Sequence, residues 1–198
     1  LYELALATSA AAIIRAAGGG YLELKTLWQH SVYTGMLAKS IFEKNTVLSG
    51  ESLFVSGLLS NVGTLAVVQY SPEIAMNAIA NESKGQYSWQ REIEVLGFSM
   101  VEAGGALLQH WQLPEDIYIP IQYLHRPDEV TPPCLPCHAL HTANRLASEI
   151  LYTDKQLVFR GSIGSTSLNT LHCTQEDLDF LVEQAIDKAP EMMTIFTL

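Results

Sequence analysis

Basic side chains are scarce in this sequence. The 198 residues include 11 Lys and Arg against 21 Asp and Glu, a formal net charge of −10 at pH 7. Proteins that bind nucleic acids gather Lys and Arg against the phosphate backbone, so nucleic acid is not an expected partner. Charged residues make up 16% of the chain, against about 25% in typical globular proteins. We therefore expect part of the surface to be covered by a partner.

The sequence also has no unbroken apolar run long enough to cross a membrane. The most apolar stretches are residues 4–14, which end at Arg15, and residues 53–68, which contain serines, glycines and an asparagine. A spanning helix needs about 20 largely apolar residues. Residues 1–7 contain an acidic Glu3 and no basic residue, unlike a secretory signal. These absences predict a cytoplasmic protein with no membrane segment.

Cysteine is limited to Cys134, Cys137 and Cys173, too few and odd in number for a disulfide framework. The first two belong to a C-x-x-C-H pattern, which is also the pattern of covalent haem attachment. With His138 and His141 the pair would offer four zinc ligands, although structural zinc normally joins distant segments. Haem attachment requires export, for which the sequence shows no signal.

We therefore predict that Cys134 and Cys137 are free thiols at the start of a helix, with no haem or zinc and no disulfide needed for folding. A helix N-terminus would still raise the reactivity of Cys137.

Alternating apolar and polar runs are nearly absent, while apolar residues recur at three- and four-residue spacing. This periodicity predicts an all-α protein. Ser99 and Glu102 form a capping box, Gly97 should end the helix before it, and Pro120 should kink a helix. The expected helices cover residues 3–16, 24–43, two short helices within 52–69 separated at Ser60-Asn61, 72–85, 92–96, 99–111, 113–126, 137–152 and 174–189.

Several separated motifs occur in a characteristic order and spacing. They are Leu27-Trp28-Gln29-His30-Ser31, residues 57–63, residues 94–105, His110-Trp111-Gln112-Leu113-Pro114, Tyr123-Leu124-His125-Arg126-Pro127 and residues 142–147. In this arrangement the chain resembles the HDOD family, the HD-related output domains of bacterial signalling proteins. The resemblance implies an HD-domain-like helical bundle over residues 1–152, with residues 153–198 forming a C-terminal loop and capping helix of the same domain. A helical subdomain usual in that family is expected to be missing on the N-terminal side, since the sequence starts at Leu1 rather than Met.

Catalytic relatives in the HD superfamily hydrolyse phosphoesters with one or two metal ions, and the resemblance places their ligands on this chain. A first His corresponds to His30, a His-Asp pair to Ser60 and Asn61, further His positions to Met100, Leu124 and His125, and a last Asp to Asn144. Both Asp positions are thus neutral amides. Hard divalent cations are neutralised mainly by carboxylates, so we predict a vestigial pocket with no metal, no cofactor and no catalytic residue.

These residues favour a non-catalytic module for bacterial signal transduction, the output domain of a larger response-regulator-like protein. It would act through protein contacts, with a protein partner, the missing N-terminal subdomain or a second copy of the chain. The alternative is a metal-dependent phosphohydrolase or cyclic-dinucleotide phosphodiesterase of the HD superfamily that recruits other ligands, such as Glu94 or Glu102.

We predict that the apolar stretch 4–14 needs a covering surface, because large apolar patches are seldom left to solvent on a monomer. The 198-residue chain should therefore self-associate, or melt at a lower temperature than a longer form that supplies the cover. Light scattering and thermal melts of both forms measure this. A monomer as heat-stable as the longer form would show that the stretch needs no cover.

Overall fold

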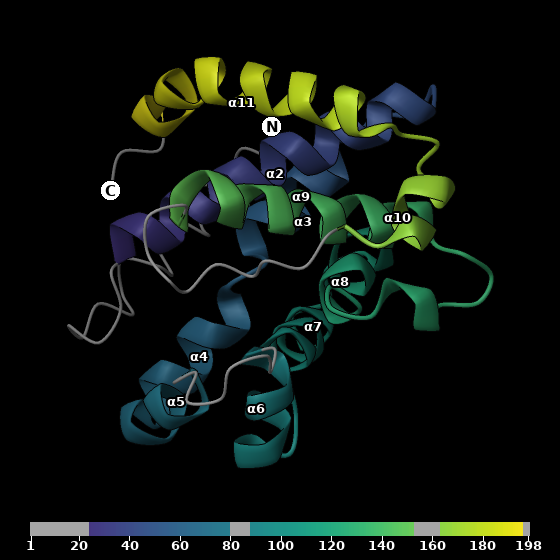
Figure 1. Cartoon of the computed structure of the whole chain (residues 1–198). Helices are drawn as coiled ribbons and strands as arrows, with labels where there is room; N and C mark the ends of the chain where they lie inside the picture. The colour runs from purple at the N-terminus through teal and green to yellow at the C-terminus, as the bar shows by residue number, and fades with distance from the viewer. Residues whose placement is uncertain (1–23, 80–87, 153–162, 196–198) are drawn as a thin grey trace.

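Helices account for all regular secondary structure in the residues that the computed structural model describes, which are 24–79, 88–152 and 163–195 (Figure 1). The predicted all-α class is confirmed; the helix expected over 3–16 lies outside the described residues. The elements are α2 Leu24–Asn45, α3 Glu51–Leu59, α4 Val62–Tyr70, α5 Pro72–Ile79, α6 Ser88–Leu96, α7 Met100–His110, α8 Glu115–Gln122, the 3-10 turn η1 Pro127–Glu129, α9 Leu135–Tyr152, α10 Ser165–Thr170 and α11 Gln175–Ile195.

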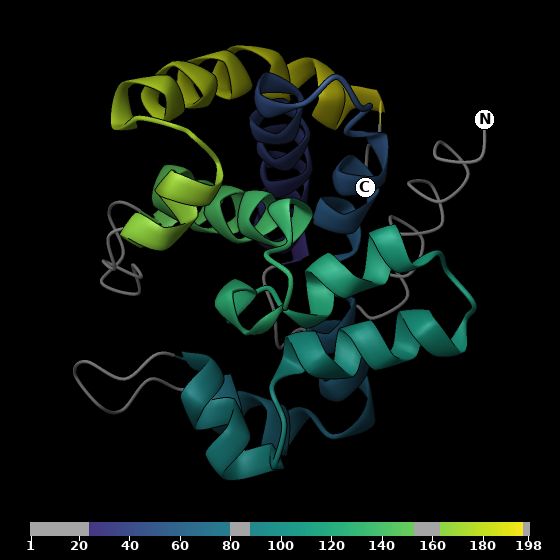
Figure 2. The same ribbon diagram turned by 90° about the vertical axis from the view of Figure 1, so that its right-hand side faces the viewer.

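The long helices α2 and α9 form the centre of the fold, and α3 and α11 pack on α2 (Figures 1 and 2). Leu37 and Ile41 of α2 are completely buried in the main core cluster. Ala139, Ala143 and Ala147 of α9 belong to the same cluster and are equally buried. Their four-residue spacing places them on one face, and small side chains allow neighbouring helices to approach closely.

A second group of helices, α4 to α7, lies below this centre in Figure 1. Two close helix contacts depend on glycine. A Cβ atom on Gly57 of α3 would lie 2.3 Å from the backbone of Gly35 in α2, and one on Gly63 of α4 would lie 1.9 Å from the carbonyl oxygen of Met100 in α7. These helices therefore meet backbone to backbone.

The local signals in the sequence act as expected. Ser99 and Glu102 form both hydrogen bonds of the capping box, and Gly97 takes φ 83°, the left-handed conformation that ends α6. The polar pair Ser60-Asn61 separates α3 from α4. Pro120 lies inside α8, and the kink expected there stays a prediction.

Several helix ends differ from the prediction, and the 3-10 turn η1 and the short helix α10 were not predicted. The helix α6 begins at Ser88 rather than at residue 92, and α8 covers Glu115–Gln122 rather than residues 113–126. The helix end expected at residue 85 lies outside the described residues.

The helix α9 begins at Leu135, two residues early, because the sulfur of Cys134 accepts from the backbone N–H of Cys137 in its first turn. At the other end, α11 continues through Pro190 to Ile195. Pro190 is exposed, so water can satisfy the carbonyl oxygen that loses its donor there.

The stretch Glu51–Tyr70 is long and apolar enough to span a membrane by length and composition, with a mean hydropathy of 1.4. It consists of two helices, α3 and α4, and 61% of it is buried inside the fold. A core helix of a soluble protein has the same character. The absence of a membrane segment stays a prediction.

We predict that Gly63→Ala destabilises the protein by about 1–3 kcal/mol, because the added methyl group cannot fit against the α7 backbone without moving it. Urea unfolding followed by circular dichroism measures this. Gly164→Ala is the control, since a Cβ there meets nothing within 4 Å. Equal midpoints for the two variants would contradict the close contact of α4 and α7.

Candidate functional site

A cavity of about 440 Å³ lies where the central helices meet the α4–α7 group. The seven positions that the HD resemblance singles out all lie on its wall. Its lining consists of Leu27, His30, Ser60, Asn61, Thr64, Ile79, Trp89, Glu92, Met100, Val101, Leu124, His125, His141, Asn144, Arg145 and Ser148. The structure therefore gathers residues more than 110 positions apart in the sequence into one pocket.

The imidazole of His30 uses both of its nitrogens within the protein. Its Nε2 lies 3.0 Å from Oγ of Ser148, and its Nδ1 lies 3.4 Å from Nδ2 of Asn61. Ser148 donates its own hydroxyl hydrogen to the carbonyl oxygen of Asn144, so Nε2 of His30 must carry the hydrogen that it donates. This network assigns a neutral imidazole with Nδ1 as the acceptor.

Burial supports the neutral state of His30. The side chain is 7% exposed, and burial lowers its pKa from 6.5 to about 4, against a smaller opposing effect of the Asn144 backbone. A group buried in this way loses the hydration that stabilises its charged form. At neutral pH the pocket therefore holds an uncharged His30.

The break between α3 and α4 is satisfied by its own side chains. Asn61 donates through Nδ2 to Oγ of Ser31 at 3.0 Å, and Ser60 donates through Oγ to the carbonyl oxygen of Gly57 at 2.7 Å. In this orientation the amide of Asn61 presents hydrogen-bond donors to α2, where a carboxylate would present only acceptors.

His125 follows α8 and lies against an aromatic and cationic wall. Its ring stacks on Trp89 with centroids 5.9 Å apart, and the guanidinium of Arg126 lies 5.8 Å from the Trp89 ring. Burial lowers the pKa of His125 to about 3, and His141, Arg126 and Arg145 add electrostatic repulsion. The positive charges of Arg126 and Arg145 would also repel a metal ion approaching His125.

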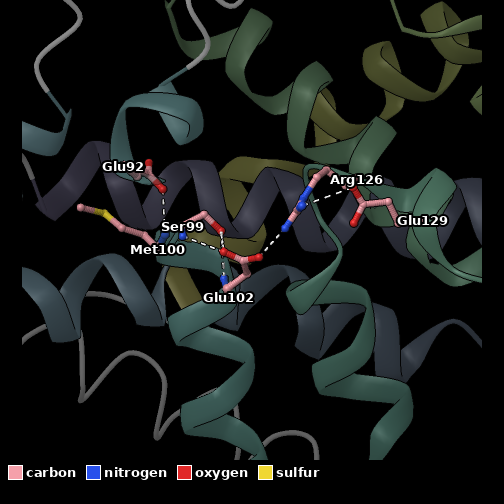
Figure 3. A network of polar contacts seen from close by, with 6 residues as sticks. All are labelled: Glu92, Ser99, Met100, Glu102, Arg126 and Glu129. Atoms are coloured by element: carbon pink, nitrogen blue, oxygen red, sulfur yellow. Dashed lines mark hydrogen bonds and ion pairs between the residues drawn. The ribbon is translucent and has the colours of Figure 1, made fainter. Parts of the chain in front are cut away.

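The acidic residue on the cavity wall is Glu92, which the sequence analysis missed. Glu92 is 7% exposed and accepts a hydrogen bond from the backbone N–H of Met100 at 2.7 Å (Figure 3). Burial raises its pKa, and the negative charge of Glu102 raises it further. Trp89, Glu92 and Leu96 share one face of α6 by helical spacing, and an acidic residue on such a face was the signal available in the sequence.

The two acidic residues proposed as substitute ligands lie elsewhere. Glu102 accepts from Ser99 in the capping box and is ion-paired with Arg126, which also contacts Glu129 (Figure 3). Glu94 lies 3.7 Å from the guanidinium of Arg91, and its side chain is 57% exposed. Neither residue lines the cavity.

The donor set does not fit a metal ion of the HD type. Across residues 24–79, 88–152 and 163–195, no three His, Cys, Asp or Glu side chains come together as a metal site requires. Met100 and Leu124 offer no strong ligand, and both amide positions lack charge. Whether the purified protein carries a metal stays a prediction.

The cysteine prediction is wrong in one respect, because Cys134 and Cys137 are joined in a disulfide. The first turn of α9 brings their Cα atoms within 5.2 Å, inside the range that a disulfide bridges. The two histidines of the zinc alternative have other partners. His138 contacts Ser167 at 3.0 Å, whereas His141 contacts the carbonyl oxygen of Leu124 at 2.7 Å and lines the cavity.

Comparison with known proteins identifies the family. The family model of the HDOD domain matches residues 1–127, more than half of the chain. The chain belongs to the HDOD family. No curated protein matches it in sequence.

Solved structures share the fold at low sequence identity. An HDOD domain protein of unknown function from Geobacter sulfurreducens has a TM-score of 0.72 at 21% identity, and a "Putative phosphohydrolase" from Shewanella amazonensis has 0.73 at 20%. The alignments cover 95% and 94% of this chain and 68% of each relative. The MmoQ response regulator of Methylococcus capsulatus has a TM-score of 0.59 at 20% identity over 82% of this chain and 62% of its own. The predicted family and the HD-like helical bundle are thus confirmed, while the division at residue 152 stays a prediction.

We predict that His30 makes the folded state sensitive to acid. The unfolded chain takes up a proton on His30 near pH 6.5, whereas the folded chain resists until about pH 4. The contribution of His30 to the free energy of unfolding should therefore be fully present above pH 6.5. Between pH 6.5 and about pH 4 the free energy of unfolding should fall by at most about 1.4 kcal/mol per pH unit. Urea unfolding from pH 7.5 to 4 measures the slope.

The variant His30→Gln should flatten this part of the curve relative to the wild type. His110→Gln is the matched control, because His110 is exposed at the end of α7. The interpretation fails if wild type and His30→Gln give parallel curves over the whole range.

Proposed function

We propose that this chain is a non-catalytic HDOD module that regulates a bacterial signalling pathway in the cytoplasm through protein contacts. The observation that carries the proposal is the state of His30. Both ring nitrogens bind neutral groups of the protein, and its pKa of about 4 keeps the ring uncharged. Because both nitrogens of His30 already have protein partners, His30 could bind a metal only if this hydrogen-bond network were broken.

Charge supports the same conclusion. Divalent cations in proteins need carboxylates to offset the loss of their hydration shell. In this cavity Asn61 and Asn144 occupy the two expected carboxylate positions, and Arg145 adds a positive charge. Glu92 is the acidic group on the wall, and its raised pKa and its bond to Met100 fit a structural role.

The regulatory half of the proposal is supported by the family and by fold relatives. A response regulator and a protein of Marinobacter aquaeolei described as a "Putative signal transduction protein" share this fold. The alignment covers 40% of the Marinobacter protein, as expected for one module of a longer chain. A protein partner, a preceding helical subdomain or a second copy of this chain would then receive the signal.

We predict that the protein hydrolyses neither cyclic dinucleotides nor a generic phosphodiester, with Mg²⁺ or Mn²⁺ present, because no metal-activated water can form. Product chromatography against buffer, with an active HD phosphodiesterase as positive control, measures turnover. Elemental analysis should find no stoichiometric metal. The alternative phosphohydrolase would be supported by turnover that is lost in Asn61→Ala, or by one equivalent of Mn, Fe, Ni or Zn that is lost in His30→Ala.

The regulatory role is tested in the organism that encodes the chain. An allele carrying both His30→Gln and Asn61→Ala should complement a deletion of the gene as well as the wild-type allele does, provided that the variant protein accumulates to the same level. Failure of this allele at equal protein level, with a urea midpoint equal to that of the wild type, would contradict a role through protein contacts alone.

A further inference from the structure

The C-x-x-C motif lies at the start of α9, and neither of its cysteines lines the cavity. Cys134 immediately precedes the helix and Cys137 lies in its first turn. Their Cα atoms are 5.2 Å apart and their sulfur atoms are paired. Helix geometry brings residues three apart onto one face, so the pairing needs no movement of distant segments.

The two cysteines differ in exposure and in local field. Cys137 is completely buried, whereas Cys134 is partly exposed. The backbone N–H of Cys137 points to the sulfur of Cys134 at 3.3 Å, in the position of a helix N-cap. A helix N-terminus stabilises a thiolate, which is the nucleophile in disulfide exchange. Cys134 is thus placed to react with a molecule in solution, and Cys137 with Cys134.

Stabilisation of the fold does not account for the pair. A bond between residues three apart closes a very small loop and restricts the unfolded chain little, compared with a bond between distant segments. Zinc does not account for it either, because His138 and His141 are committed to Ser167 and to the Leu124 carbonyl.

We propose that Cys134 and Cys137 form a reversible dithiol–disulfide pair that exchanges with low-molecular-weight disulfides such as oxidised glutathione. The Cys134 thiolate attacks one sulfur of the small disulfide, forms a mixed disulfide and releases one thiol. The Cys137 thiolate then attacks the Cys134 sulfur and releases the second thiol. Two electrons and two protons pass from the protein to the small disulfide, and excess dithiol reverses the reaction.

The pair belongs to the helix that also builds the cavity. Asn144, Arg145 and Ser148 lie on later turns of α9 and line the pocket around His30. The disulfide thus lies at the start of the helix that packs against α2. The inference is independent of the proposed function, because it holds whether or not the cavity binds or hydrolyses anything.

The test is a redox titration of the folded protein in mixtures of reduced and oxidised glutathione. Free thiols are trapped by acid, alkylated with a maleimide and mapped by peptide mass spectrometry. Cys134 and Cys137 should lose and regain alkylation together, in a single two-electron transition that dithiothreitol reverses. Persistent alkylation of both residues at every ratio, or a disulfide that dithiothreitol leaves intact in the folded protein, would overturn the proposal.

Single variants test the two roles. In Cys137→Ser the reaction should stop at glutathione attached to Cys134, and in Cys134→Ser no glutathione should attach to the buried Cys137. Cys137→Ala replaces Cys137→Ser if circular dichroism shows that the serine variant does not fold. Cys173→Ser is the control and should titrate like the wild type, since Cys173 is a buried free cysteine. Glutathione on Cys137 and not on Cys134 would contradict the assigned order.

Discussion

The hydrogen bonds of His30 on α2 connect α9 with the break between α3 and α4, and all three segments line the cavity. One ring nitrogen contacts Ser148 on α9, and the other faces Asn61 at the break between α3 and α4. These contacts require a neutral ring, since a protonated Nδ1 would point its hydrogen at the amide hydrogens of Asn61. Burial of His30 and the geometry of the pocket therefore depend on each other.

This dependence explains how an HD-type fold can persist without the charges of an HD-type site. In a catalytic site, a metal ion would hold the helices that supply its ligands. Here Asn61 donates to Ser31, and Ser148 links His30 to the Asn144 carbonyl. Neutral hydrogen bonds buried at low dielectric can replace the metal as a link between helices, provided that each donor finds an acceptor.

Sequence reasoning located the helices and the seven pocket positions, because both depend on local patterns and on motif order. It missed Glu92, whose contact with Met100 depends on how α6 packs against α7. It also treated Cys134 and Cys137 through the redox state of the compartment, whereas their pairing follows from the first turn of α9. For these two cysteines, the redox state of the compartment predicted the pairing less well than the helix geometry around them.

The position of Asn61 is set by backbone contacts on both sides of it. Gly57 on α3 lies against Gly35 of α2, and Gly63 on α4 lies against the carbonyl of Met100 in α7. Backbone contacts of this kind leave less freedom than contacts between long side chains, because no rotamer change can relieve them. The break at Ser60-Asn61 is thus fixed between two rigid contacts, and the amide reaches His30 and Ser31 through the fold itself. A substitution at either glycine would be expected to displace the pocket as well as to weaken the packing.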